Sequence, residues 1–162
     1  MLHKFFAASL YGIALSATPL AALPVSAATM AGLTGDNTLV LIDHRASMVE
    51  KQVKVSGVEG KLIGIDVRPA NGKLYGVASD NALYTIDIDT GRATKTVALN
   101  KAFPMAGRAI VDFNPVADRL RLMSNDGTSF RVNVDTGEVA VDGSHNYDKS
   151  AAWANDKPMV MA

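Results

Sequence analysis

The chain has 162 residues, of which 48% are hydrophobic and 20% charged, and its 16 lysines and arginines balance 16 aspartates and glutamates. This composition supports one globular domain with an apolar core and excludes a disordered polymer. The neutral charge argues against a general nucleic-acid binder, which needs a surplus of positive charge. The absence of cysteine excludes disulfides, thiolate metal sites and a cysteine nucleophile.

Residues 1–27 have the pattern of a signal peptide. Lys4 gives a short basic start, Phe5 to Leu23 carries no charge, and the small residues Val25 and Ala27 follow. We therefore expect cleavage after Ala27 and export to a bacterial periplasm or to the medium. The alternative is a retained membrane anchor, because the apolar stretch approaches spanning length. No other segment is long and apolar enough to span a bilayer, so we expect no membrane span after cleavage.

Residues 28–143 contain an internal repeat of about 45 residues. So many positions agree that the repeat is the most specific feature of the sequence. The matching segments are Ile65–Pro69 with Val111–Pro115 and Asp89–Gly91 with Asp135–Gly137, both 46 residues apart, and Asp36–Asp43 with Asp80–Asp87, 44 residues apart.

Each repeat unit predicts four short antiparallel strands. The first strand, Leu62–Ile65 or Ala109–Val111, is apolar on both faces, which favours a strand covered on both sides. Asn71-Gly72 predicts a tight turn. Asp-Thr-Gly closes the third strand, with the aspartate capping the turn and glycine in the left-handed conformation. Four-stranded units of this length are typical of β-propeller blades, so we expect an all-β, partial β-propeller of about two and a half blades.

Residues 144–162 lose the pattern and form an irregular tail. The chain stops at Pro158–Ala162, which has the character of the start of a further apolar strand. We expect the chain to be a fragment of a longer repeat array, with residues 144–162 leading into a further repeat. Two alternatives stay open: the ring is completed by association of chains, which would cover open blade edges, or the units stack as an open fan.

The repeat motifs resemble those of a bacterial family of exported proteins catalogued as domain of unknown function 4394. The resemblance covers essentially the whole mature chain and implies propeller-type repeats, further strands beyond the present end, and no catalytic residues that can be carried over. It is carried by Gly32–Asn37, Leu62–Pro69, Leu74–Gly76, Leu83–Asp87, Val111–Pro115, Asp118–Arg121, Arg131–Gly137 and Asp142-Gly143.

Polar residues recur where the first strand of each unit ends. Asp66 and Asp112 occupy matching positions, and Asn114 follows two residues later. In a propeller these side chains could meet at the channel mouth and bind calcium or a polar ligand. The alternative is that each one hydrogen-bonds the backbone of a nearby turn. Arg121, with Arg119 and Arg131 close by, could receive a carboxylate or sulfate, or could pair with aspartates such as Asp118.

Two functions fit this pattern. The first is a non-catalytic exported binding or scaffold module that takes a small molecule or an envelope protein as its partner. The second is a metal-assisted hydrolase or lactonase of propeller type, with Asp66, Asp112 and Asn114 at the channel. We expect no cofactor for the first, whereas calcium would serve the second.

Overall fold

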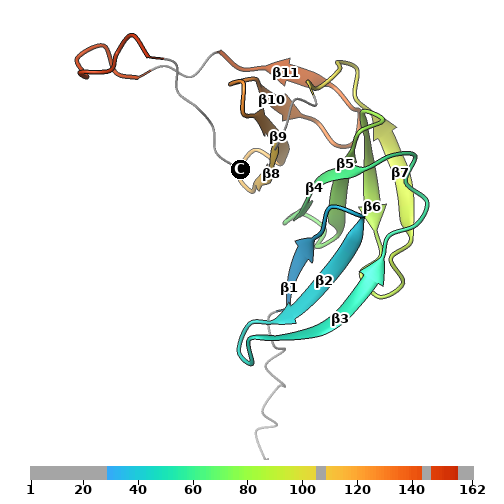
Figure 1. Ribbon diagram of the computed structural model, residues 1–162. Helices are drawn as coiled ribbons and strands as arrows, with labels where there is room; N and C mark the ends of the chain where they lie inside the picture. The colour runs from blue at the N-terminus through green and yellow to red at the C-terminus, as the bar shows by residue number, and fades with distance from the viewer. Residues whose placement is uncertain (1–28, 105–108, 144–146, 157–162) are drawn as a thin grey trace, which may run out of the picture.

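The computed structural model describes residues 29–104, 109–143 and 147–156. These residues form three antiparallel sheets and no helix, which confirms the predicted all-β class. The sheets follow one another along an open arc (Figure 1). The described part of the chain accordingly holds no helix able to cross a membrane. The predicted signal peptide and the segment 158–162 lie outside the described residues.

Each sheet corresponds to one unit of the repeat. The first sheet has three strands and is the partial upstream copy, while the second and third sheets have four strands each, in the order of the chain. The bounds are β1 (Thr29–Leu33), β2 (Thr38–Asp43) and β3 (Met48–Lys54) in the first sheet, β4 (Leu62–Val67), β5 (Leu74–Ala78), β6 (Ala82–Ile86) and β7 (Ala93–Ala98) in the second, and β8 (Ala109–Asn114), β9 (Arg119–Ser124), β10 (Ser129–Val132) and β11 (Val139–Val141) in the third.

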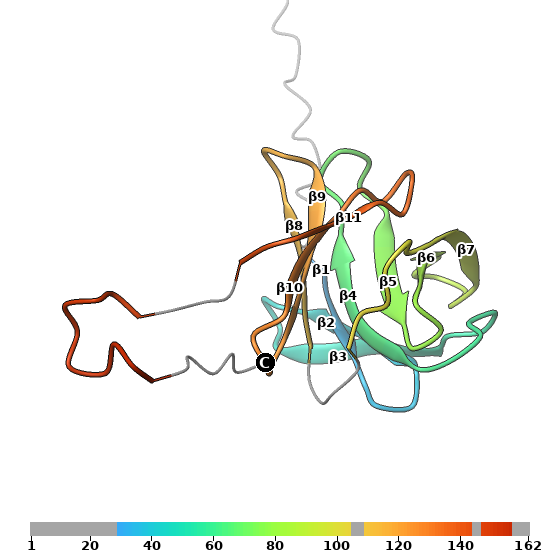
Figure 2. The same cartoon turned by 90° about the horizontal axis from the view of Figure 1, so that it is seen from above.

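The first strands of the second and third sheets, β4 and β8, contact each other, and they face the inner side of the arc in Figure 1; Figure 2 shows the same sheets from above. Most of their residues are only partly buried. We expected strands covered on both sides, and the difference has a simple cause. Each is an edge strand with a hydrogen-bonded neighbour on one side only, and the cover of its two faces depends on the sheets that lie next to it.

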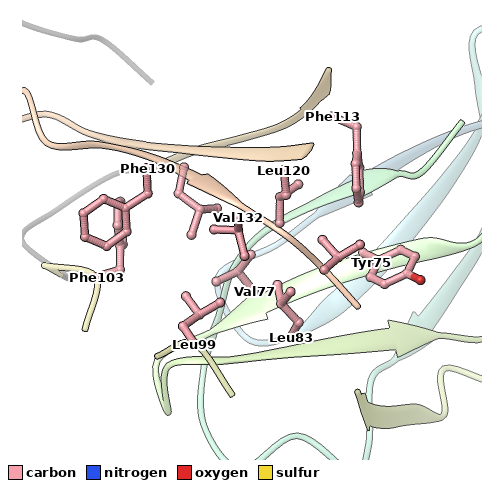
Figure 3. Packing of buried hydrophobic residues seen from close by; sticks show 11 residues of the cluster. Tyr75, Val77, Leu83, Leu99, Phe103, Phe113, Leu120, Phe130 and Val132 are labelled. Carbon is pink, nitrogen blue, oxygen red and sulfur yellow. The ribbon is translucent and has the colours of Figure 1, made fainter. Parts of the chain in front are cut away.

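The core lies between consecutive sheets and consists of two clusters. One joins the first and second sheets around Leu39 and Tyr84, both fully buried. The other joins the second and third sheets, where Val77 and Leu83 meet Leu120 and the neighbouring apolar residues of the third sheet (Figure 3). Since a single sheet cannot cover its own apolar faces, stacking of the units provides most of the burial.

The Asp-Thr-Gly turn of each complete unit contacts the sheet before it. Gly91 and Gly137 have φ of 73° and 75°, as predicted for the left-handed position. Their carbonyls accept hydrogen bonds from the N–H groups of Ser56 (3.0 Å) and Asn100 (3.0 Å), which follow the last strand of the preceding sheet. A Cβ on either glycine would overlap the backbone of that sheet. Glycine is therefore needed at each position for two reasons: it adopts the positive φ, and it lets the turn approach the backbone of the preceding sheet closely.

The capping residue of this turn differs from the one predicted. Asp87, two residues before the Asp-Thr-Gly segment, accepts hydrogen bonds from the N–H groups of Asp89 (3.0 Å) and Thr90 (2.8 Å). In the third sheet Asn133 takes the same place and accepts from the N–H of Asp135 (3.1 Å). The aspartate of the motif thus stays available for other contacts.

Candidate functional site

A pocket lies at one end of the second sheet. It has a volume of about 460 Å³, which is within the range of ligand pockets. The turn between β4 and β5 and the turn between β6 and β7 form its ends, and β5, β6 and β7 supply the strand residues. It is lined by Gly72, Lys73, Leu74, Thr85, Ile86, Asp87, Ile88, Thr90, Arg92 and Thr94. We call it the second-sheet pocket.

Two well-defined turns fix the backbone around this pocket. In the first, Gly72 has φ of 67° and the side-chain carbonyl of Asn71 accepts a hydrogen bond from the N–H of Lys73 (3.0 Å). In the second, Asp87 caps the turn and also accepts a hydrogen bond from the Thr90 hydroxyl (2.9 Å). These hydrogen bonds, led by the one from the Thr90 N–H, hold the pKa of Asp87 below its ordinary value. Asp87 is therefore an ionised, structurally engaged carboxylate.

The pocket carries more unpaired positive charge than negative charge. Lys73 and Arg92 are exposed, and their side-chain nitrogens make no hydrogen bond or ion pair with the described residues. The hydroxyls of Thr85 and Thr94 come from neighbouring strands that pair directly. Two cations beside hydroxyl groups, with apolar side chains such as Ile88 at the wall, suit an acidic ligand.

The predicted residues Asp66 and Asn114 both bind backbone. The two carboxylate oxygens of Asp66 accept hydrogen bonds from the N–H groups of Phe113 (2.7 Å) and Val67 (2.8 Å), so this side chain ties β4 to β8. Asn114 accepts hydrogen bonds from the N–H groups of Val116 (2.9 Å) and Ala117 (3.0 Å) and caps the turn after β8. The geometry gives both residues the turn and backbone contacts that the sequence offered as the alternative.

Asp112 and Arg121 lie together on the third sheet, whereas the Asp66 carboxylate binds the backbone N–H of Phe113 next to Asp112. Phe113 packs into the core between the second and third sheets, so its neighbour Asp112 points to the opposite face of the third sheet. Asp112 and Arg121 are cross-strand partners on that face. Arg121 lies 3.8 Å from Asp142, which also binds Arg131 at 2.7 Å. The structure brings these charges into one row but does not join Asp66 to them.

No group of three or more histidine, aspartate or glutamate side chains among the described residues is placed to hold a metal ion. Lys73 and Arg92 were not among the residues predicted from the sequence, because each is a single cation next to a turn. The signal that could have found them is their position. Lys73 directly follows Asn71-Gly72, and Arg92 directly follows Asp89-Thr90-Gly91, so both flank turns at the same end of one unit.

Comparisons with known proteins agree with the fold and leave the activity open. The family model described as domain of unknown function (DUF4394) matches residues 37–162. A structural-genomics protein of unknown function from Bacteroides thetaiotaomicron VPI-5482 has a similar solved structure, with a TM-score of 0.57 and 16% sequence identity. The similarity covers 72% of this chain and 30% of the Bacteroides protein. This chain therefore spans less than a third of the length of the Bacteroides protein. No curated protein matches the sequence.

Proposed function

The chain belongs to the family described as domain of unknown function (DUF4394), and we propose that it is an exported, non-catalytic binding module. Its ligand is a small molecule with an acidic group, held in the second-sheet pocket by Lys73 and Arg92. The observation that carries this proposal is the pair of cations that have no side-chain partner among the described residues, in a pocket of about 460 Å³. Unpaired cations next to hydroxyl groups favour binding of a carboxylate, sulfate or phosphate.

The engagement of Asp87 and Thr90 supports binding over turnover. Thr90 donates its hydroxyl hydrogen to Asp87 and its oxygen accepts from the N–H of Arg92 (3.3 Å). Both side chains therefore stabilise the turn rather than pointing free reactive groups into the pocket. A nucleophile needs a base that can take its proton during reaction, and here the carboxylate is already committed to three donors.

The proposal is tested by titrating the purified chain with sulfate, phosphate and citrate at constant ionic strength. We expect saturable binding to at least one of them, and a loss of about tenfold in affinity for Lys73→Ala or Arg92→Ala, since one charge-assisted hydrogen bond contributes about 1.5–3 kcal/mol. Lys101→Ala is the matched control, because Lys101 is an exposed lysine outside the pocket. Equal affinities in all variants would refute the proposal.

A calcium titration separates this function from the metal-assisted hydrolase or lactonase. The hydrolase predicts that calcium raises the melting temperature and that Asp112→Ala abolishes the rise. The binding module predicts no such dependence, because Asp112 lies on the third sheet and lines no part of the second-sheet pocket.

A further inference from the structure

A second pocket occupies the equivalent position in the third sheet. It has a volume of about 220 Å³ and is lined by Arg119, Arg131, Asn133, Glu138 and Ala140. Each of these residues lies 46 residues after a residue of the second-sheet pocket. The corresponding pairs are Lys73 with Arg119, Thr85 with Arg131, Asp87 with Asn133, Arg92 with Glu138, and Thr94 with Ala140. We call this the third-sheet pocket.

Both pockets contain two cations, although the residues change. The first cation is kept as lysine or arginine, at positions 73 and 119. The second moves from the turn, where Glu138 replaces Arg92, to the strand, where Arg131 replaces Thr85. The capping carboxylate of Asp87 becomes the neutral amide of Asn133, while Glu138 brings a carboxylate of its own, so two cations and one carboxylate line each pocket.

The third-sheet arginines keep donors for a ligand. Within the part of the chain that the structure describes, the Arg119 side chain donates only to the backbone carbonyls of Ala117 (3.4 Å) and Asp118 (3.1 Å), both through Nη1. Arg131 binds Asp142 through Nε at 2.7 Å. A guanidinium has five N–H donors, so the terminal Nη groups of Arg131 and the Nη2 group of Arg119 can still receive an anion.

The two pockets lie at the same end of adjacent sheets, and their separation is held by an interaction between the sheets. Arg68, which follows β4, binds Asp118 in the turn before Arg119 and Asp135 in the turn after β10. Packed sheets lie about 10 Å apart. A ligand with acidic groups at intervals along one chain could therefore reach both pockets at once.

We propose that the two pockets bind one linear acidic polysaccharide, of the polyuronate class, with one carboxylate in each pocket. This inference rests on the proposed function of the second-sheet pocket. The lining favours a sugar chain over a nucleic acid, because hydroxyl and amide groups surround the cations and neither pocket contains an aromatic side chain on which a base could stack. The chain also has no net positive charge.

The test compares galacturonate, a linear oligogalacturonate and single-stranded DNA as ligands of the purified chain. Binding at two linked pockets gives an affinity for the oligomer at least about tenfold above that for the monomer. Arg119→Ala should reduce the oligomer affinity to the monomer level and leave monomer binding at the second-sheet pocket within about twofold. Lys101→Ala is again the control, and melting temperatures verify that each variant is folded.

The outcomes distinguish the two proposals. Monomer binding that depends on Lys73, with an oligomer that binds no more tightly, would overturn the two-pocket inference alone. Oligomer affinity unchanged by Arg119→Ala would do the same, as would DNA binding as tight as that of the oligomer. Absence of binding for both monomer and oligomer would overturn the two-pocket inference, and the proposed function would fall with it only if sulfate, phosphate and citrate also fail to bind.

Discussion

The guanidinium of Arg68 binds the carboxylate of Asp118 through two parallel hydrogen bonds, of 2.9 Å from Nε and 2.5 Å from Nη2. The two residues belong to different units, since Arg68 follows β4 and Asp118 precedes β9. Arg68 also donates to Asp135, at 2.8 Å from Nη1 and 2.9 Å from Nη2, and its Nη1 donates to the Tyr75 hydroxyl at 3.4 Å. With only 11% of its side chain exposed, Arg68 joins the second sheet to two turns of the third.

Replacement of Arg68 by alanine should destabilise the protein. The change removes the hydrogen bonds to Asp118 and Asp135 and the contact of the guanidinium with the ring of Tyr75. Because the two carboxylates are partly solvated, we expect a loss of about 2 kcal/mol in the free energy of unfolding. Urea denaturation measures this loss. Arg68→Lys should recover only part of it, since lysine cannot form the parallel pair; full recovery would contradict this account.

The stabilisation by Arg68 should depend on pH. Hydrogen bonds from Arg68 hold the pKa values of Asp118 and Asp135 below their ordinary value of 3.8. Because these pKa values are lower in the folded state than in the unfolded chain, the stabilisation is present above a pH of about 4 and is lost as the pH falls through the folded values. Melting temperatures of the native chain and Arg68→Ala should therefore differ at pH 7 and converge in acid. A constant difference would contradict this.

The glycines that contact the preceding sheet should resist substitution. Gly137→Ala places a Cβ against the backbone of Ala98, whereas Gly72→Ala meets nothing within 4 Å. Both glycines have positive φ, 75° and 67°, so the conformational cost of about 1 kcal/mol is common to both. Gly137→Ala should therefore lower the free energy of unfolding by at least about 2 kcal/mol more than Gly72→Ala. Equal losses in urea denaturation would show that the close approach is unimportant.

The first sheet supplies a natural comparison for this prediction. Ser47 occupies the position equivalent to Gly91 and also has positive φ, at 52°. It is exposed, and no sheet precedes the first one among the described residues. This turn can therefore hold the side chain of Ser47, because no neighbouring sheet lies against it among the described residues.

Shortening a buried core side chain should lower the free energy of unfolding, because the core joins consecutive sheets. Leu83 is fully buried in the cluster between the second and third sheets. Leu83→Ala should reduce the free energy of unfolding by about 2–5 kcal/mol. Val116→Ala, at a side chain that is 96% exposed, is the control and should change it by less than about 0.5 kcal/mol. The two variants are compared by thermal and urea denaturation.

The repeat made most of the fold predictable. Apolar strands stopped by Pro69 and Pro115, with turn residues at constant spacing, correctly predicted antiparallel units, because proline ends a ladder and glycine permits the turn conformation. The partial exposure of β4 and β8 was not predictable from their composition. An apolar run shows that a strand can be buried, but its cover depends on the sheets that lie next to it.

Side-chain partners far apart in the sequence were harder to predict. The sequence predicts that Asp135 caps its turn. In the structure Asn133 caps the turn, and Asp135 binds Arg68 from another unit. Similarly, Lys73 and Arg92 meet in one pocket only because the turns between β4 and β5 and between β6 and β7 lie at the same end of the sheet. Such pairings are set by the stacking and register of strands, which a local pattern does not specify.

The central claim is that Lys73 and Arg92 form a binding site for an acidic ligand. The most direct measurement is isothermal titration of the native chain, of Lys73→Ala/Arg92→Ala and of Lys101→Ala with the acid that binds best among sulfate, phosphate, citrate and galacturonate. The account predicts saturable binding to the native chain and to Lys101→Ala, and a loss of at least about tenfold in the double variant. Absence of saturable binding to the native chain, or equal affinity in the double variant, would contradict it.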